Sequence, residues 1–342
     1  MKIGFVASQF GGIFRGGAEV QFENTVKAIQ SLGITCEYIG AETRSILDLD
    51  LVHFFKTDEA YLMLSSHLDA IGKPYVVSSI FYPESAGQRF FYDTVGRVSR
   101  LPGWRALTAS KKVQLLRNAA AIYPNTASEA AFVGSLAPGV RCKVVPNCAE
   151  DIYHQSQSIG ESTFRSAFTQ VPGERFVLNV GRIEPRKNQY RLILACKKAD
   201  VPLVIIGKIR DPDYWQKCLD IGYQKLYYLG EMSDKAMLIA AYKACYCFAL
   251  PSTMETPGLT AIEAALQGAR ILITQEGGTH DYFKSEAVYV DPDNQASIDA
   301  GLAEILRPER PHSGFDFSSL SYGAVAKTYI EEYERICAAA RT

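Results

Sequence analysis

The sequence predicts an α/β protein built from two doubly wound domains, each with a parallel sheet covered by helices on both faces. Short apolar runs alternate with stretches of helical spacing along the chain, which is the pattern of such sheets. The length of 342 residues corresponds to about two domains at roughly 150 residues each. A polar segment, 151–174, separates the two alternating series and is interpreted as a linker region.

The first domain is expected over residues 1–150. Its first strand, Lys2–Ala7, leads into a glycine-containing loop, and a helix over Gly16–Leu32 stops at Gly33, a good C-terminal cap. Short apolar runs bounded by polar or turn residues are typical of strands buried on both faces. Further strands are expected at Thr35–Ile39, Leu51–Phe55, Tyr75–Ile80, Ala119–Tyr123 and Lys143–Pro146.

The second domain is expected over residues 175–317 and has clearer turn signals. Its strands are expected at Phe176–Val180, Leu203–Ile206, Leu226–Leu229, Cys245–Leu250, Arg270–Thr274 and Ala287–Val290. Its helices are expected at Asn188–Ala199, Ser233–Lys243, Gly258–Gln267 and Asn294–Leu306. The chain ends with an amphipathic helix, 318–339.

Composition and charge exclude several classes of protein. The net charge of -1 argues against a dedicated nucleic-acid binder, which is usually strongly basic. Apolar runs stay below the roughly 18–20 residues that a membrane-spanning helix needs. The N-terminus lacks the layout of a signal peptide, so we expect a cytoplasmic protein. The 8 cysteines form no Cys-x-x-Cys pair and are interpreted as reduced core thiols.

Chemistry is expected in the segments that follow strands, because ligands of open α/β sheets bind beyond the carboxyl ends of the strands. The loop Ser8–Glu19 carries Gly16 and Gly17 directly before a helix. Glycines let the backbone approach a ligand, and a helix start offers free N–H groups to an anion. This loop is either a phosphate or sugar contact or a flexible turn, and its spacing differs from the dinucleotide fingerprint.

The segment Gly181–Asn188 follows the expected strand Phe176–Val180. Its Arg182 and Lys187 suit a diphosphate, because guanidinium offers a rigid fork and ammonium a point charge. Glu184 could orient one of these cations. The alternative is a solvated basic loop.

The strongest signal is the segment Pro251–Gly268. The helix expected after the strand begins at Gly258, Leu259 and Thr260, and its N-terminus suits a diphosphate. Glu255 in the loop offers a carboxylate to the hydroxyls of a neutral ring. Glu263, about one turn into the helix, offers another to a vicinal diol such as that of ribose. The alternative is that the acidic residues serve only the helix dipole.

These motifs resemble the retaining GT-B glycosyltransferases of family 4, whose two Rossmann-like domains face a central cleft. The stretch from Glu255 to Glu263 is similar to the family's Glu-x7-Glu motif, and GRIEPRKN is similar to its Gly-Arg segment with a downstream Lys. Val144–Asp151 resembles the step before the interdomain linker, and Gly16–Glu19 resembles the glycine loop. The resemblance implies that the helix 318–339 packs back onto the first domain.

The resemblance implies a donor site for a UDP- or GDP-sugar co-substrate, with no metal and no further cofactor. Arg182 and Lys187 would neutralise the diphosphate, and Glu263 would bind the ribose. Glu255 would bind the transferred sugar. The implied catalytic residues are Glu255, Arg182 and Lys187. The remaining donor contacts would come from Gly16, Gly17, Gly258, Leu259 and Thr260.

The implied function is transfer of a hexosyl unit, with retention of configuration, from a nucleotide-sugar to a glycan or a polyprenyl-diphosphate-linked glycan. The setting would be surface polysaccharide biosynthesis. Two alternatives stay open: a nucleotide-sugar epimerase on the same fold, and an inactive nucleotide-sugar-binding subunit. The base, the sugar and the acceptor are not indicated.

The acceptor side departs from the family pattern. Many members carry a His after the strand that corresponds to Tyr75–Ile80, where this chain has Phe81 and Tyr82. The acceptor-side candidates are His53, Tyr82 and Glu84; for His53 the alternative is a core histidine. A second departure is Pro257 before the motif glycine, where the family often has an aromatic residue.

The stretch Thr94–Ser128 is basic and contains no acidic residue. Cations interleaved with apolar residues and a Trp suit an anionic membrane surface or a lipid-linked acceptor. The alternative is a solvated helix face over a core stripe. The expected contacts, for a protein peripheral on the inner face of the membrane, are Arg100, Trp104, Arg105, Lys111 and Lys112.

Overall fold

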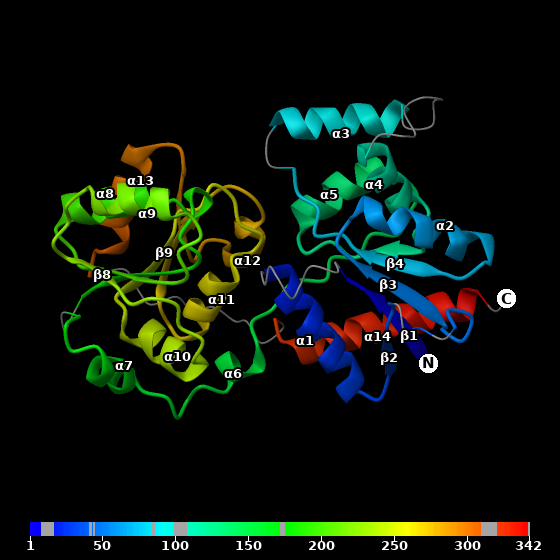
Figure 1. Ribbon diagram of the computed structural model, residues 1–342, viewed down its shortest axis with the longest axis horizontal. Coiled ribbons are helices and arrows are strands. Elements are labelled where there is room, and N and C mark those ends of the chain that lie inside the picture. The colour runs from blue at the N-terminus through cyan, green and yellow to red at the C-terminus, as the bar shows by residue number, and fades with distance from the viewer. Residues whose placement is uncertain are drawn as a thin grey trace. The chain divides into compact units, whose positions relative to one another are not determined.

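The computed structural model describes residues 1–7, 17–40, 43, 45–83, 86–98, 108–171, 175–308 and 320–340. The chain forms two compact units, the first Met1–Cys148 with Ser319–Thr342 and the second Ala149–Ser318. Each unit has its own parallel sheet with helices packed on it (Figure 1), which confirms the predicted fold class. The segment expected as a linker, 151–174, lies in the second unit and carries α6 (Asp151–His154) and α7 (Glu161–Ala167).

The sheet of the first unit has the order β2-β1-β3-β4-β5, with every neighbouring pair parallel. Its strands are β1 (Lys2–Val6), β2 (Thr35–Tyr38), β3 (Leu51–Phe55), β4 (Tyr75–Ser78) and β5 (Ala121–Ile122).

The strand expected at Lys143–Pro146 is a wrong prediction. The segment runs beside β5 with Lys143 N–H bonded to the Ile122 carbonyl and Val145 N–H to the Pro124 carbonyl. Pro124 has no N–H to donate in return, so the ladder stops at an isolated bridge between Ile122 and Cys142.

Alternate residues of the first sheet pack into two separate hydrophobic cores. On β3, Leu51 and Phe55 pack with α1 and α14, whereas Val52 and Phe54 pack with α2, α4 and α5. The C-terminal helix α14 therefore belongs to the first unit and lies against α1. The helices of this unit are α1 (Gly17–Ser31), the 3₁₀ turn η1 (Glu59–Tyr61), α2 (Leu62–Ala70), α3 (Ala86–Val98), α4 (Thr108–Arg117), α5 (Ala127–Leu136) and α14 (Tyr322–Ala339).

The sheet of the second unit has the order β11-β10-β9-β6-β7-β8 and is also parallel. Its strands are β6 (Val177–Val180), β7 (Leu203–Ile206), β8 (Leu226–Tyr228), β9 (Cys247–Leu250), β10 (Arg270–Thr274) and β11 (Val288–Val290). Its remaining helical segments are η2 (Pro185–Lys187), α8 (Gln189–Ala199), α9 (Pro212–Leu219), α10 (Lys235–Ala244), α11 (Leu259–Leu266), α12 (Thr279–Phe283) and α13 (Gln295–Ile305).

The strand order of the second sheet reverses between β6 and β9. β6 pairs with β7 on one side and with β9 on the other, so the connections that follow β6 and β9 leave in opposite directions. Loops diverge at such a switch point and open the place where α/β sheets bind ligands. The segments after β6 and β9 are the two that carry the strongest sequence motifs.

Candidate functional site

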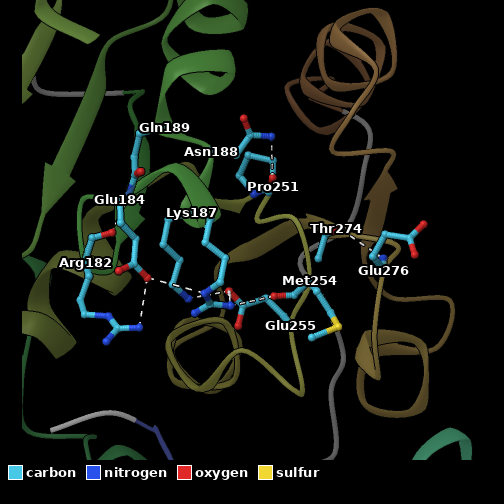
Figure 2. Close-up of polar contacts among 11 residues, drawn as sticks. Arg182, Glu184, Lys187, Asn188, Gln189, Pro251, Met254, Glu255, Thr274 and Glu276 are labelled. Carbon is cyan, nitrogen blue, oxygen red and sulfur yellow. Dashed lines mark hydrogen bonds and ion pairs between the residues drawn. The ribbon is translucent and has the colours of Figure 1, made fainter. Parts of the chain in front are cut away.

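The loops after β6 and β9 are hydrogen-bonded to each other along their backbones. Thr253 N–H donates to the Arg186 carbonyl at 2.9 Å, and the Arg186 guanidinium donates to the Met254 carbonyl at 3.0 Å. Asn188 Nδ2 adds bonds to the carbonyls of Pro251, at 3.0 Å, and Pro292, at 2.9 Å. The two loops therefore form one framework at the switch point (Figure 2).

Asn188 is a structural residue of this framework that the sequence did not single out as a site residue. Its backbone is left-handed, with φ of 57°, a conformation that Asn tolerates better than most residues. Its amide ties the chain after β9 to the chain after β11. The Asn at the end of the GRIEPRKN motif is thus explained by backbone geometry and by these two carbonyls.

Cations and carboxylates alternate across the joined loops (Figure 2). Lys187 Nζ lies 2.5 Å from Glu255 Oε1, and Arg186 Nη1 lies 3.9 Å from the same oxygen. Arg182 Nη2 lies 3.0 Å from Glu184 Oε1, and Arg186 Nε lies 3.6 Å from the same Glu184 oxygen. The structure therefore brings together Arg182, Lys187 and Glu255, the predicted catalytic set, and in this loop pair cations outnumber carboxylates. An anion placed among them gains a net attraction.

Glu255 is held in its ionised form. Burial by itself raises the pKa of this carboxyl, but the charges of Lys187 and Arg186 outweigh it and bring the pKa below its usual value. The side chains of Glu255 and Lys187 are 8% and 12% exposed, so their pair is weakly screened by water. An ionised carboxylate only accepts hydrogen bonds, which suits the hydroxyls of a sugar.

The start of α11 is open to an anion. Gly258 adopts φ of 84°, and a Cβ there would lie 3.1 Å from Leu250 Cδ2, so both conformation and space favour glycine. Gly258 supplies no side-chain cap to the helix, and Leu259 and Thr260 are only partly buried. The first N–H groups of a helix have no partner inside the helix, and they favour negative charge.

Glu263 lies one turn further along α11, in different surroundings. The buried Tyr242 hydroxyl donates to Glu263 Oε2 at 2.8 Å. Burial raises the pKa of Glu263 to about 7, opposed by hydrogen bonds from Tyr242 and Tyr153. The two carboxylates of the Glu-x7-Glu motif are therefore held by different partners, Glu255 by cations and Glu263 by hydroxyls.

His53, an acceptor-side candidate, lies instead in the core of the first unit with 0% exposure. Its Nδ1 is 2.5 Å from the Tyr333 hydroxyl and its Nε2 is 2.8 Å from Ser78 Oγ. Burial lowers its pKa to about 3, so the ring is neutral. Both ring nitrogens are occupied inside the fold, so the interpretation as an acceptor contact is wrong and the core alternative is right.

The other expected positions of the first unit are only partly described. Tyr82 is partly buried after β4, and Gly17 is the first residue of α1. Lys112 on α4 pairs with Glu59 at 3.6 Å and lies over the Phe81 ring, and Lys111 beside it is partly buried. The positions that fall outside the described residues are Gly16, Glu84, Arg100, Trp104 and Arg105.

Sequence reasoning missed Glu129, a buried carboxylate at the start of α5. Its Oε1 accepts the Ser79 hydroxyl at 2.5 Å and the Phe81 N–H at 2.8 Å, and its Oε2 accepts the Asn125 N–H at 2.9 Å. Between these donors Ile80 has φ of 40°, an outlier for a β-branched residue. Glu129 thus accepts hydrogen bonds from the residues on both sides of the strained Ile80, and these bonds hold the turn after β4 in place.

A sequence signal for this position was present. Thr126 and Glu129 have the spacing of a capping box, and the Thr126 hydroxyl does accept the Glu129 N–H at 3.0 Å. The Glu129 carboxylate turns toward β4 instead of back to the cap, which only the packing of α5 on the sheet decides.

Within the described ranges, no helix is both long and apolar enough to cross a membrane. In the same part of the chain, no group of three or more His, Cys, Asp or Glu side chains could hold a metal ion.

Comparisons with known proteins bear on the second unit most strongly. Residues 161–313 match the family model of glycosyl transferases group 1. An uncharacterized glycosyltransferase of Methanocaldococcus jannaschii is 30% identical over 151 residues, 42% of this chain and 38% of that protein. The serotype-specific mannosyltransferase WbdA of Escherichia coli is 24% identical over 267 residues, 73% of this chain and 31% of that protein. The chain thus spans about a third of the length of these relatives.

Solved structures resemble the whole chain in fold. Sucrose-phosphate synthase from Thermosynechococcus elongatus has a TM-score of 0.76 at 14% identity, covering 99% of this chain and 100% of that one. HepE of Anabaena, solved in complex with UDP and glucose, has a TM-score of 0.72 at 19% identity, covering 98% and 100%. The likeness shows the GT-B fold. The motifs around Lys187, Glu255 and Glu263 lie within the residues that match the model of glycosyl transferases group 1, so the second unit is similar to that family.

Proposed function

We propose that this chain transfers a hexosyl unit from a nucleotide-sugar, with retention of configuration, to a glycan or lipid-linked glycan of a surface polysaccharide. The observation that carries the proposal is the Lys187–Glu255 pair beside the uncapped start of α11, at the switch point of the second sheet. The site combines fixed positive charge with two carboxylates of different character.

The donor half of the reaction follows from these groups. The diphosphate would lie between Lys187, Arg182 and the first N–H groups of α11, with Thr260 and Leu259 against it. Glu255, kept ionised by its cations, would accept hydrogen bonds from hydroxyls of the transferred sugar. Glu263 would accept those of the ribose.

Catalysis would rest on charge stabilisation. Negative charge grows on the diphosphate as the glycosidic bond breaks, and preorganised cations and helix N–H groups stabilise that charge most in the transition state. Lys187 is suited to this role because Glu255 already holds its ammonium in place. The first unit would supply Gly16 and Gly17 beneath the donor.

Relatives support the chemical class. WbdA is a mannosyltransferase, and HepE was solved with UDP and glucose, so hexosyl donors based on UDP or GDP are the first to test. On the acceptor side the remaining candidates are Tyr82 and Glu84. The turn that Glu129 clamps leads directly to Tyr82 and gives this part of the chain a defined shape.

An anionic membrane surface is the partner that we propose for the first unit. Helix α3 packs through Tyr92 and Val95 and turns Phe90 and Phe91 outward, with 74% and 47% of these rings exposed. Large exposed aromatic side chains beside cations are typical of helices that lie on membranes. Arg89 and Arg97, on the same helix, are exposed. Lys111 would extend the contact, together with Arg100, Trp104 and Arg105, which lie outside the described residues.

The experiment is a thermal-shift panel of UDP-, GDP- and ADP-sugars, followed by assays of the stabilising compound with and without polyprenyl-diphosphate glycan acceptors. Transfer with retained configuration, strongly slowed in Lys187→Ala, is the expected result. Stabilisation by no member of the panel would overturn the donor site. Conversion of the donor without an acceptor would favour the epimerase alternative, and binding without turnover would favour the inactive subunit.

A further inference from the structure

Two tyrosines from different elements of the second unit lie near the Glu263 carboxylate. Tyr242, fully buried on α10, donates to Oε2 at 2.8 Å. Tyr153, 3% exposed on α6, acts in the same sense as Tyr242 and lowers the pKa of the same carboxyl. The two rings lie with centroids 6.3 Å apart. Neither tyrosine belongs to the sequence motif that contains Glu263.

Tyr153 is itself fixed against α11. The Gln267 amide at the end of this helix donates to the Tyr153 carbonyl at 2.8 Å, and Ser156 Oγ donates to Gln267 Oε1 at 2.6 Å. The backbone of Tyr153 is therefore tied to α11, the helix that carries Glu263. A carboxylate that accepts a hydrogen bond from a buried hydroxyl is restricted in orientation, and its remaining lone pairs point in defined directions.

Two further charged groups, Glu150 and Lys235, influence the pKa of Glu263. Glu150, next to α6, pairs with Lys235 of α10. Glu150 acts to raise the pKa of Glu263 and Lys235 acts to lower it, while burial is the largest cause of its rise to about 7. The tyrosine hydroxyls oppose this rise, because hydrogen bonds to a carboxylate favour its ionised form.

We propose that Tyr242 and Tyr153 are positioning residues that orient the Glu263 carboxylate toward both hydroxyls of the donor ribose, and so set a preference for ribonucleotides over 2′-deoxyribonucleotides. The inference rests on the proposed donor site and names residues that act through Glu263. A carboxylate aimed at a diol rejects an analogue that lacks one hydroxyl, since one of its oriented acceptor sites then stays unpaired.

The test uses the full chain and whichever of UDP-glucose and GDP-mannose binds it, together with the 2′-deoxy analogue of that compound. A nucleotide-sugar is chosen because its diphosphate does not titrate near neutral pH. Affinities are measured by calorimetry between pH 6 and pH 8.5 for the wild type, Glu263→Gln, Tyr242→Phe and Tyr153→Phe. Tyr223→Phe is the matched control, because its hydroxyl bonds the carbonyls of Cys196 and Val201 elsewhere in the unit.

We expect Glu263→Gln to lose most of the preference for the ribonucleotide. Tyr242→Phe should lower the preference about fivefold at pH 7, the effect of one hydrogen bond. In Tyr242→Phe the pKa of Glu263 rises, so the pH below which affinity falls should move upward; Tyr153→Phe should do the same, and Tyr223→Phe should change neither quantity.

An unchanged preference and an unchanged pH midpoint in both tyrosine variants, with Glu263→Gln still defective, would overturn the inference and leave the donor site standing. Failure of the wild type to bind either nucleotide-sugar would instead overturn the proposed function. A change in stability alone does not alter the ratio of two affinities measured on one variant, so this ratio separates positioning from a merely structural role.

Discussion

The polar side chains on and directly after the strands have opposite roles in the two sheets. In the first unit, His53 on β3 and Ser78 on β4 are fully buried and bonded to Tyr333 and Tyr329 of α14. In the second unit, Lys187 and Glu255 stand in the loops beyond the strands. One set attaches a helix to the sheet, and the other pairs opposite charges within the loops.

Two buried carboxylates, Glu332 in the first unit and Glu255 in the second, show the same difference between the units. Glu332 of α14, 4% exposed, accepts two bonds from Arg141, at 2.9 Å each, and further bonds from Lys143 and Arg335. Its cations all come from the first unit and bind the helix in place. Glu255 is as deeply buried, yet its cations sit on a loop that also faces the open start of α11. Burial beside cations is therefore common to both carboxylates, and what distinguishes Glu255 is its place next to a helix start that has no side-chain cap.

The largest expected effect comes from removing the Lys187 ammonium. Lys187→Ala should lower the rate of transfer about 100- to 1000-fold, because it removes a preorganised positive charge from the diphosphate. The measurement is the transfer rate at saturating donor. Lys198→Ala is the control, since Lys198 is 73% exposed and pairs only at the surface with Asp299.

Loss of Lys187 also leaves the Glu255 charge buried without its main partner. The double variant Lys187→Met with Glu255→Gln should therefore recover thermal stability relative to Lys187→Ala and stay inactive. Recovery of transfer in the double variant would contradict the assigned role of the ammonium.

Glu332 offers the matching experiment in the first unit. Glu332→Gln should lower the free energy of unfolding by about 2 kcal/mol, because it weakens the hydrogen bonds of a buried acceptor to charged partners that are themselves partly exposed, without changing nucleotide affinity. Glu334→Gln, an exposed residue on the same helix, is the control. A weakened nucleotide affinity in folded Glu332→Gln would break the proposed contrast between the two carboxylates.

The contribution of Glu332 to the free energy of unfolding should decrease as the pH falls. Its bond to Arg141 is the largest cause that brings its pKa down to about 2, below the ordinary value of 4.5. The stability that it contributes is complete above pH 4.5 and is lost as the pH falls toward about 2. Glu332→Gln should therefore show a shallower acid transition in the first unit.

His53 predicts a second, smaller pH effect. Because its folded pKa is about 3 and its unfolded value 6.5, the unfolded chain binds one more proton between these values. The free energy of unfolding should fall by about 1 kcal/mol between pH 6.5 and about pH 5.5. His53→Asn should lose this part of the slope in denaturant titrations, and the exposed His67→Asn should keep it. An unchanged slope in His53→Asn would show that the ring titrates normally.

The smallest expected effect concerns the surface of α3. Replacing both Phe90 and Phe91 by Ser should weaken co-sedimentation with phosphatidylcholine–phosphatidylglycerol vesicles about tenfold, through lost apolar contact. Met63→Ser is the control, since Met63 is also 74% exposed but lies on α2. Equal sedimentation of all variants, or no dependence on the anionic lipid, would count against the membrane contact.

Sequence reasoning found the second unit better than the first. The strands β7 and β10 match their expected bounds, as β3 does in the first unit, but Arg182, Lys187, Glu255 and Glu263 all lie in the second unit. These residues follow strands within short motifs, so their positions depend on local chain geometry. The first unit depends on contacts between distant segments, and there the pattern gave His53 the wrong role and passed over Glu129.

The sequence by itself determined the alternation of strands and helices, the two sheets and the donor motifs, because periodicity and strand-to-helix loops are local properties. The tertiary structure alone decided which polar groups are available. His53 is closed off by Tyr333, 280 residues away in the chain, and Glu263 is oriented by Tyr242 and Tyr153 from other elements. Burial and hydrogen-bond partners arise from packing between distant segments, which no local pattern encodes.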